Sequence, residues 1–447
     1  MDSALRIVDW REALQTLLRR SPGAWFEEVP GSVLDHIHRT FGEPLTPEQV
    51  VARILRDVRD RGDAALRDWT AVLDGVVFDT LEVPRADWEA AWKGLPAHLQ
   101  DALMLAADRI RRFHAEQPVA SWFTDGLGGR MGQRVVPLDR VGVYVPGGMA
   151  PLPSSLLMAV IPARVAGVRE VIICTPPNRS TGEVAPITLA SAHVAGADRL
   201  FRVGGAQAVA AMAFGTESVP RVDKIVGAGG LFATLAKRQV YGIVGLDGIY
   251  GPTETVIVAD DSANPRWVAA DLLAQAEHDF LATAILLTPS RALAEAVRTE
   301  VDRQLETLSR AEVARSALAA RGGIVLTPDL ETAVRLADEF APEHLCLSVR
   351  NPTDWVESIR HAGGLFLGEH SFEVLGDYLA GPSHVMPTGG TARFASPLNV
   401  LDFVKVISVV ALDPETARAI GPAAADLAEA ETLTAHARAA RFREDGG

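Results

Sequence analysis

Strand-like and helix-like segments alternate from residue 140 to residue 367, and this alternation limits the chain to few folds. In the first half, apolar runs typical of strands cover residues 141–145, 170–174, 200–203 and 224–226, followed by helical patterns at 154–165, 187–194, 206–214 and 231–241. The second half has strands at 255–258, 284–288, 323–326, 344–349 and 364–367, and helices at 264–277, 291–320, 330–340 and 352–361. Strands joined through helices pair in parallel, with helices on both faces. We therefore predict the α/β fold class, with two Rossmann-like parallel-sheet domains.

Domain limits follow from where this alternation starts and stops. At 447 residues the chain is too long for one ordinary core, so we expect more than one domain. Residues 41–139 and 254–400 should form a larger α/β domain, with a smaller sheet domain at 140–253 inserted in it. Helical extensions flank this body: an N-terminal arm at 1–40 with a Pro/Gly break at 21–23, and a C-terminal tail at 401–447 that begins with a β-like run.

Charge, hydropathy and cysteine content argue against several classes of protein. The net charge of −14 argues against nucleic acid or an anionic membrane as the main partner. Hydrophobic runs are interrupted before they reach the length of a membrane span, and the N-terminus lacks the apolar core of a signal peptide. The two cysteines, Cys174 and Cys346, provide no disulfide framework, so we expect a cytoplasmic protein.

A carboxylate and an imidazole stand side by side where a predicted helix meets a predicted strand. Glu343 and His344 follow Pro342, which disfavours helix for the residue before it, so the pair should sit on a stiff turn at a strand end. Side chains at such turns often point into an active-site crevice. For an isolated dipeptide, the alternative is a surface glutamate beside a histidine that is satisfied in the core.

Glycine-rich turns follow three strands of the first half, at 147–148, 204–205 and 227–230. A nucleotide could lie there on backbone N–H groups at helix N-termini. The segment 227–232 matches a dinucleotide fingerprint only in part, and no acidic residue stands at the expected ribose position. Tight turns needed for packing are the alternative explanation.

Histidines and acidic residues in the second half could form a metal site. Gln275 and His278 are three residues apart near the end of a predicted helix and share one face. Asp377 precedes His384 in a turn-rich segment, and Glu431 and His436 are five residues apart near the C-terminus. Each of these side chains offers a carboxylate oxygen or an imidazole nitrogen as a possible metal ligand. Two imidazoles, a carboxylate and an amide oxygen suit Zn²⁺. Surface polar groups are the alternative for each residue.

These motifs together resemble those of the histidinol dehydrogenase family, in the same order. The matching segments are 144–148, 222–225, 236–240, 275–278, 342–345, 376–378, 383–388 and 433–436. The resemblance extends from about residue 40 to about residue 440. It implies a zinc-containing, NAD-dependent homodimer with shared active sites, which oxidises L-histidinol to L-histidine through the aldehyde in two hydride transfers, the last step of histidine biosynthesis.

The resemblance also implies roles for individual residues. His344 would be the main general base, and Glu343 would activate water for the second oxidation. The zinc ligands would be Gln275, His278, Asp377 and His436. The residues that contact substrate would be Thr253, Gln275, His278, His344, Asp377, His384, Glu431 and His436. Glu431 and His436 would come from the C-terminal tail of the partner subunit. NAD would contact Tyr144, Gln207 and the turn at Gly230.

Two departures from the family pattern leave the substrate open. Gly230 replaces an asparagine that usually closes the turn touching NAD, and Thr253 replaces a serine that usually contacts substrate. A paralogous zinc- and NAD-dependent dehydrogenase of another small amino or sulfonated alcohol is therefore the first alternative. A zinc hydrolase that uses Glu343 to activate water, and a non-catalytic ligand-binding relative, are the others.

Cys346 lies two residues after His344 and would share its face of a strand. A covalent thiohemiacetal mechanism could use it. A buried structural thiol is the better interpretation, because no basic group other than His344 is near in sequence to lower its pKa.

Overall fold

The computed structural model describes residues 3–20, 23, 29–147 and 151–443. Gly148 of the first glycine-rich turn, and residues 21–22 of the predicted break, lie outside the described residues. The chain divides into a larger compact unit, residues 1–116 with 139–403, and a smaller one, residues 117–138 with 404–447.

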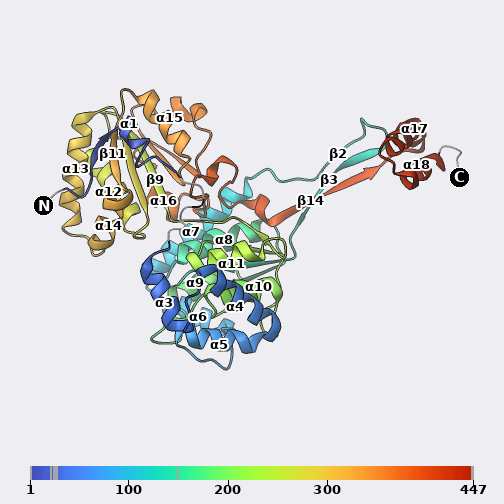
Figure 1. Cartoon of the computed structure of the whole chain (residues 1–447), viewed down its shortest axis with the longest axis horizontal. Helices are drawn as coiled ribbons and strands as arrows, with labels where there is room; N and C mark the ends of the chain where they lie inside the picture. Colours follow the sequence, from blue (N-terminus) through green and yellow to red (C-terminus); the bar gives the residue numbers. More distant parts are fainter. Residues whose placement is uncertain (1–2, 21–22, 24–28, 148–150, 444–447) are drawn as a thin grey trace. The chain divides into compact units, whose positions relative to one another are not determined.

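A six-stranded parallel sheet forms one core of the larger unit (Figure 1). Its order is β1-β11-β10-β9-β12-β13, with β1 (Ile7–Asp9), β9 (Glu254–Ala259), β10 (Thr283–Thr288), β11 (Gly323–Leu326), β12 (His344–Ser348) and β13 (Gly364–Leu367). One face is covered by α12 (Pro265–Ala276), α13 (Arg291–Leu305) and α14 (Ala311–Arg321), and the other by α1 (Trp10–Ala13) and α15 (Leu330–Phe340). Because both faces are covered, β9, β10 and β12 are buried along their whole length.

A five-stranded parallel sheet forms the second core of this unit. Its order is β6-β5-β4-β7-β8, with β4 (Arg140–Tyr144), β5 (Glu170–Cys174), β6 (Arg199–Phe201), β7 (Lys224–Val226) and β8 (Gly245–Leu246). The flanking helices are α8 (Pro153–Val165), α9 (Pro186–Ala195), α10 (Gly205–Phe214) and α11 (Leu231–Val240). The two parallel sheets with helices on their faces confirm the predicted α/β fold class.

The N-terminal segment differs from the expected helical arm. Residues 7–9 form β1, which pairs in parallel with β11 at the edge of the six-stranded sheet, and only then come α1 and, further on, α3 (Gly31–Phe41). The pattern of apolar residues here suits a helix or a strand. The pairing partner lies about three hundred residues away in sequence, so local periodicity could not reveal it.

The helices before residue 116 also pack differently from the expectation. Apolar side chains of α4 (Pro47–Arg61) and α5 (Asp63–Asp74) share a core with α10 and α11, so they cover the five-stranded sheet. The next two helices, α6 (Arg85–Gly94) and α7 (Ala97–Ala115), pack on α9 and α8. Residues 41–116 therefore pack with residues 140–253, which were expected to form the inserted domain alone. An amphipathic pattern shows that a helix has a buried face without showing which sheet that face covers.

Two helices of the second half are also shorter than predicted. The expected helix at 291–320 is divided into α13 and α14, and the expected helix at 352–361 is a 3₁₀ helix, η1 (Pro352–Ser358). The first helix breaks between Leu305 and Ala311, and helix ends are the part of such a pattern that is hardest to predict.

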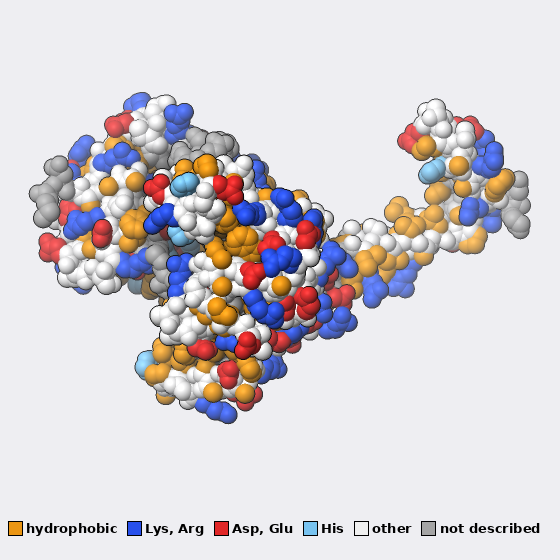
Figure 2. Space-filling view, turned by 60° about the horizontal axis from the view of Figure 1, so that its bottom comes forward, with side chains coloured by type: hydrophobic (Ala, Val, Ile, Leu, Met, Phe, Trp, Pro, Cys, Tyr) orange, Lys and Arg blue, Asp and Glu red, His pale blue; other side chains and the backbone are white. Residues whose placement is uncertain are grey.

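The smaller unit is an antiparallel sheet with two helices. The order β14-β3-β2 joins β14 (Val404–Ala411) to β3 (Arg130–Pro137) and β2 (Trp122–Thr124), and α17 (Pro414–Ala430) and α18 (Thr434–Arg441) follow. The predicted β-like run and helical end of the tail are thus confirmed. Many large apolar side chains of this unit are exposed, among them Val406, Val410, Leu427 and Phe442. Figure 2 shows hydrophobic side chains on the surface of this unit. In the described part of the chain, no helix has both the length and the apolar character needed to cross a membrane.

A buried ion pair holds the turn that follows β7. Lys237 Nζ of α11 lies 2.6 Å from Asp247 Oδ1, and the two side chains are 2% and 1% exposed. Lys237 also donates to the carbonyl of Gly227 at 2.9 Å, and Asp247 Oδ2 accepts from the Gly227 N–H at 2.7 Å. The pair therefore fixes the backbone of the third glycine-rich turn.

Replacing Lys237 by Met should destabilise the protein strongly, because the change leaves the Asp247 carboxylate buried without its cation. We expect a loss of about 3–5 kcal/mol in the free energy of unfolding, measured by urea denaturation. Lys93→Met, at an exposed position on α6, is the control and should change little. Equal unfolding midpoints for the two variants would contradict the role given to the pair.

Candidate active site

The Glu343–His344 turn is built from the end of α15 and the start of β12. Ala341 closes the helix with a left-handed conformation, φ 53°, and its N–H bonds the carbonyls of Ala337 and Asp338. The N–H groups of two residues just before and at the start of β13, Gly363 and Gly364, then bind the carbonyls of Pro342 and Glu343 at 3.0 and 2.8 Å. The predicted stiff turn is therefore present, at the amino-terminal end of β12.

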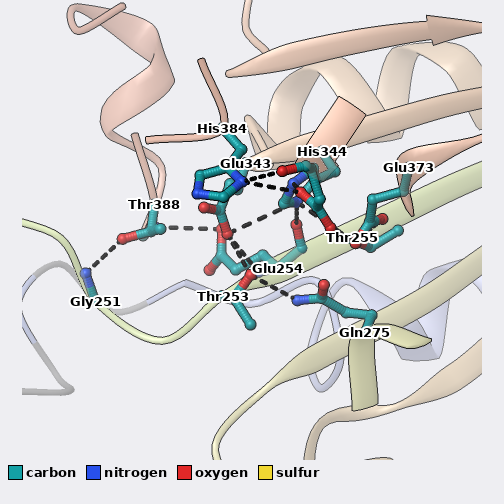
Figure 3. Close-up of polar contacts among 12 residues, drawn as sticks. Gly251, Thr253, Glu254, Thr255, Gln275, Glu343, His344, Glu373, His384 and Thr388 are labelled. Carbon is teal, nitrogen blue, oxygen red and sulfur yellow. Dashed lines mark hydrogen bonds and ion pairs between the residues drawn. The ribbon is translucent and has the colours of Figure 1, made fainter. Parts of the chain in front are cut away.

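The Glu-His pair is buried and held by the backbone of β9 (Figure 3). Glu343 is 7% exposed and His344 is 4% exposed, which excludes a surface glutamate. The N–H of Glu254 donates to Glu343 Oε2 at 3.0 Å, and the carbonyl of the same residue lies 3.1 Å from His344 Nδ1. Because a carbonyl only accepts, Nδ1 carries a proton. His344 Nε2 is buried and has no hydrogen-bond partner among the described residues.

A chain of side-chain hydrogen bonds joins this pair to α12. Gln275 Nε2 donates to Thr253 Oγ1 at 2.9 Å, and the Thr253 hydroxyl donates to Glu343 Oε2 at 2.6 Å (Figure 3). This chain fixes the orientation of the Gln275 amide. Its oxygen is left buried, without a partner among the described residues, on a side chain that is fully buried. A buried amide oxygen without a donor is a candidate metal ligand.

Carboxyl groups surround the His344 imidazole. Nδ1 lies 3.7 Å from Glu343 Oε2 and 3.9 Å from Glu373 Oε1, and Nε2 lies 3.6 Å from Asp377 Oδ1. Burial lowers the pKa of His344, but the fields of Glu373, Glu343 and Asp377 outweigh burial and raise this pKa to about 10. Burial raises the pKa of Glu343 and of Glu373 to about 7 in each case. Carboxyl groups outnumber the cationic groups here, so the site favours a cation.

His384 connects this cluster to the other sheet. Its Nδ1 lies 2.7 Å from the carbonyl of Asp377, and its Nε2 lies 3.1 Å from Ser155 Oγ on α8. Nδ1 therefore donates, and Nε2 accepts from the serine hydroxyl. Burial lowers the pKa of His384. This histidine is neutral near neutral pH, unlike His344.

The residues proposed to bind a cofactor lie at the carboxyl edge of the five-stranded sheet. Tyr144 ends β4, and its hydroxyl accepts from the N–H of Gly205, the first residue of α10, at 3.1 Å. Gln207 is 1% exposed, and its side-chain oxygen has no partner among the described residues. Gly230 precedes α11, and the space where its Cβ would stand is open. Two helix N-termini and an unpaired buried amide suit an anionic, hydrogen-bonding ligand.

A cavity of about 200 Å³ adjoins Gln207. Its lining includes Phe41, Asp74, Arg179, Gly205, Gln207 and Phe232. Burial raises the pKa of Asp74, at the end of α5, to about 6, and its Oδ2 has no hydrogen-bond partner among the described residues. An acidic residue therefore lines this cavity, supplied from a helix that precedes the first strand of this sheet.

The expected metal ligands are divided between the two compact units. Gln275 and Asp377 adjoin Glu343 and His344, and His278 follows α12 close enough for the charge of Asp377 to act on it. Glu431, at the end of α17, and His436, on α18, belong to the smaller unit. Among the described residues, no three His, Cys, Asp or Glu side chains of one chain converge as a metal site.

Cys346 is buried in the core between β12 and α12, and burial raises the pKa of its thiol well above the usual value. These observations support the structural interpretation of this residue.

Sequence reasoning missed several residues of the site. Glu254, Glu373, Ser155 and Asp74 contact or adjoin the residues that it found. Glu373 had a usable signal, because it lies four residues before Asp377 on the short helix α16 (Glu373–Tyr378) and so shares its face. The others are brought in by tertiary packing.

Comparison with known proteins gives one family. The family model for histidinol dehydrogenase matches residues 42–444. The chain is 56% identical over 417 residues to histidinol dehydrogenase from Deinococcus radiodurans, covering 93% of this chain and 95% of that protein. It is 55% identical to the Thermus thermophilus enzyme, covering 89% and 95%. The crystal structure of histidinol dehydrogenase from Elizabethkingia anophelis superposes with a TM-score of 0.90 at 32% identity, covering 99% of this chain and 98% of that chain.

Replacing Glu373 by Gln should lower the pKa of His344 in the metal-free protein, because the change removes a negative charge that favours the imidazolium and leaves the imidazole buried. Titration of ¹⁵N-labelled histidine side chains by NMR measures this pKa. Glu331→Gln, at an exposed position on α15, is the control. An unchanged or higher pKa of His344 in Glu373→Gln would show that Glu373 does not set the charge of this site.

Proposed function

The chain belongs to the histidinol dehydrogenase family and is an oxidoreductase, and on this premise we propose that it oxidises L-histidinol to L-histidine through histidinal, with two hydride transfers to NAD. The observation that carries the proposal is the buried Glu343–His344 pair, joined through Thr253 to a Gln275 oxygen that has no partner among the described residues. The pair supplies two proton acceptors, and Gln275 supplies an unsatisfied ligand atom. The two oxidations need both.

In the first oxidation, His344 would accept the hydroxyl proton while the carbon loses hydride. Nε2 is the nitrogen available, because Nδ1 is committed to the carbonyl of Glu254. The field of the surrounding carboxylates keeps His344 protonated, with a pKa of about 10. A cationic ligand beside Asp377 offsets part of that field and so lowers the pKa towards the range in which imidazole acts as a base. A positioned base contributes about 10²- to 10⁴-fold to the rate.

In the second oxidation, Glu343 would take a proton from the water that hydrates the aldehyde. Burial gives this carboxyl group a pKa of about 7, which suits a base near neutral pH. Among the described residues, the hydrogen bonds from Thr253 and from the Glu254 N–H both go to Oε2 of Glu343, so Oε1 remains to accept from water. Loss of hydride from the hydrate then gives the carboxylic acid, a second NADH and a proton.

Gln275, His278 and Asp377, with His436 of a second copy, would hold Zn²⁺. The unpartnered Gln275 oxygen and the excess of carboxylates fit a divalent cation. When bound, zinc would supply a Lewis acid that orients the substrate's amino and imidazole groups. His384, Thr253 and Glu431 of a second copy would contact the substrate.

NAD would lie on the five-stranded sheet, where its nicotinamide accepts the hydride. Tyr144, Gln207 and the turn at Gly230 would contact it, with the pyrophosphate near the N-termini of α10 and α11. The Asp74 carboxylate could accept hydrogen bonds from a ribose, as acidic residues do in other dinucleotide sites.

A homodimer with shared active sites would complete the enzyme. The apolar side chains exposed on β14, α17 and α18 need a protein surface to cover them, and the same unit carries Glu431 and His436. The two free cysteines are both buried, which agrees with a cytoplasmic setting.

L-Histidinol with NAD should yield two NADH per molecule oxidised, because the alcohol and the hydrated aldehyde each lose one hydride. NADH absorbance and the amount of histidine formed give this ratio. Removing metal with a chelator should abolish turnover, and adding Zn²⁺ should restore it. Turnover only with another small amino or sulfonated alcohol would favour the paralogous dehydrogenase, and hydrolysis without NAD would favour a zinc hydrolase.

Subunits carrying His344→Ala and His436→Ala should complement each other, because a mixed dimer would have one site that contains both histidines. After denaturation, equal mixing and refolding, half of the dimers are mixed and half of their sites intact, so activity should recover to roughly a quarter of the wild-type value. Each variant refolded alone is the control.

His436→Ala should lose zinc, measured by atomic absorption, whereas Glu343→Gln should keep it. No recovery, or equal zinc in all variants, would rule out the shared site.

A further inference from the structure

An arginine of the N-terminal segment binds the two residues that flank the Glu343–His344 pair. Arg20 Nη1 donates to Glu254 Oε1 at 2.6 Å, and Nη2 donates to Oε2 at 2.7 Å. The guanidinium and the carboxylate therefore form a bidentate ion pair. Arg20 Nε also donates to the carbonyl of Phe340 at 2.6 Å, and the guanidinium carbon lies 3.7 Å from the centre of the Phe340 ring. The arginine side chain is thus fixed by three hydrogen bonds and a stacked ring.

The two residues that Arg20 binds belong to the two segments that hold the pair. Glu254 is the first residue of β9, and its backbone N–H and carbonyl contact Glu343 and His344. Phe340 is the last residue of α15, three residues before Glu343. Arg20 therefore fixes the spacing between β9 and the turn that carries the pair. The Gly389 N–H donates to the same Glu254 carboxylate at 3.2 Å, which adds a third segment.

This contact is largely withdrawn from water, since the Arg20 and Glu254 side chains are 24% and 9% exposed. A buried ion pair is weak evidence for stability, because desolvation opposes the attraction between the charges. The bidentate contact between guanidinium and carboxylate nevertheless restricts the orientation of both side chains strongly. Arg20 also precedes residues 42–444, the segment that matches the family model.

We propose that Arg20 is a positioning residue, which keeps Glu343 and His344 in their working geometry by binding Glu254 and the end of α15. The inference rests on the proposed function, in which this pair moves the protons. Among the described residues, no hydrogen bond or ion pair joins Arg20 to either residue of the pair. Its loss should change the rate of the chemical steps more than the binding of substrate or NAD, because small displacements of a base reduce its efficiency.

Arg20→Met keeps the length and apolar stem of the side chain and removes the fork. We expect kcat to fall by about 10- to 100-fold with little change in KM for either substrate and with zinc content unchanged. Arg20→Lys keeps one charged donor and should recover part of the loss. Arg19→Met, at the exposed neighbouring position, is the matched control and should keep wild-type kcat.

A double-mutant cycle with Glu254→Gln separates positioning from simple loss of stability. If Arg20 acts through Glu254, the losses in kcat in the two single variants should not add in the double variant. The ¹⁵N signal of His344 in the free protein should shift in Arg20→Met and stay unchanged in Arg19→Met. A folded Arg20→Met enzyme with wild-type kcat and an unshifted His344 signal would overturn the proposal, as would a lower melting temperature with no change in kcat.

The wild-type protein separates this inference from the proposed function. If wild-type protein does not oxidise histidinol, the proposed function fails, and the His344 signal still reports whether Arg20 positions the imidazole. If wild type is active and both readouts of Arg20→Met are unchanged, only the positioning role fails.

Discussion

Keeping an imidazole charged inside a protein is the constraint on which this site depends. His344, Glu343 and Glu373 are each less than a tenth exposed, and each would be costly to ionise alone. They compensate one another: the carboxylates raise the pKa of the imidazole to about 10, and the imidazolium limits how far burial raises the pKa values of the two glutamates. Asp377 adds a further carboxylate to this cluster, and the nearby cation Arg20 is already paired with Glu254. The remaining deficit of positive charge is what a metal ion or a cationic substrate can fill.

The two candidate sites lie at opposite edges of their parallel sheets, and the helix dipoles suit each edge to a ligand of different charge. At the six-stranded sheet, α12 and α15 end beside the site, so their partially negative carboxyl ends favour a cation. At the five-stranded sheet, α10 and α11 begin beside Tyr144 and Gly230, so their partially positive amino ends favour phosphate. Open α/β sheets usually bind ligands at the carboxyl ends of their strands, and the candidate cofactor site on the five-stranded sheet lies at that edge, whereas the Glu343–His344 pair does not. Glu343 and His344 lie at the amino end of β12, where the ends of these helices favour a cationic ligand.

Features of the fold and the candidate site could be predicted from the sequence where they depend on neighbouring residues, and could not where they depend on residues far apart in the chain. The strand and helix alternation is local, so the fold class and most strands were predicted within a residue or two; β12 was expected at 344–349 and covers 344–348. Site residues were found where they stand in short motifs, as Glu343 and His344 do. Arg20, Asp74 and Ser155 could not be found in this way, because each reaches the site from a segment that is distant in sequence and carries no motif. The assignment of α4 and α5 to a sheet failed for the same reason: amphipathicity shows that a face is buried without identifying what covers it.

If the proposed homodimer forms, the smaller unit suggests why part of the site would stand on a second copy. Among the described residues of α17 and α18, only Ala425 and Ala437 are buried, whereas Leu427 of α17 and Phe442, which follows α18, are 69% and 68% exposed. So small a core provides little stability by itself, and covering the exposed apolar side chains would provide more. If His436 completes the zinc site of the partner, the same association adds a ligand that the first copy lacks. Metal binding and dimerisation would then stabilise each other, since a ligand that binds only the assembled state shifts the equilibrium towards it.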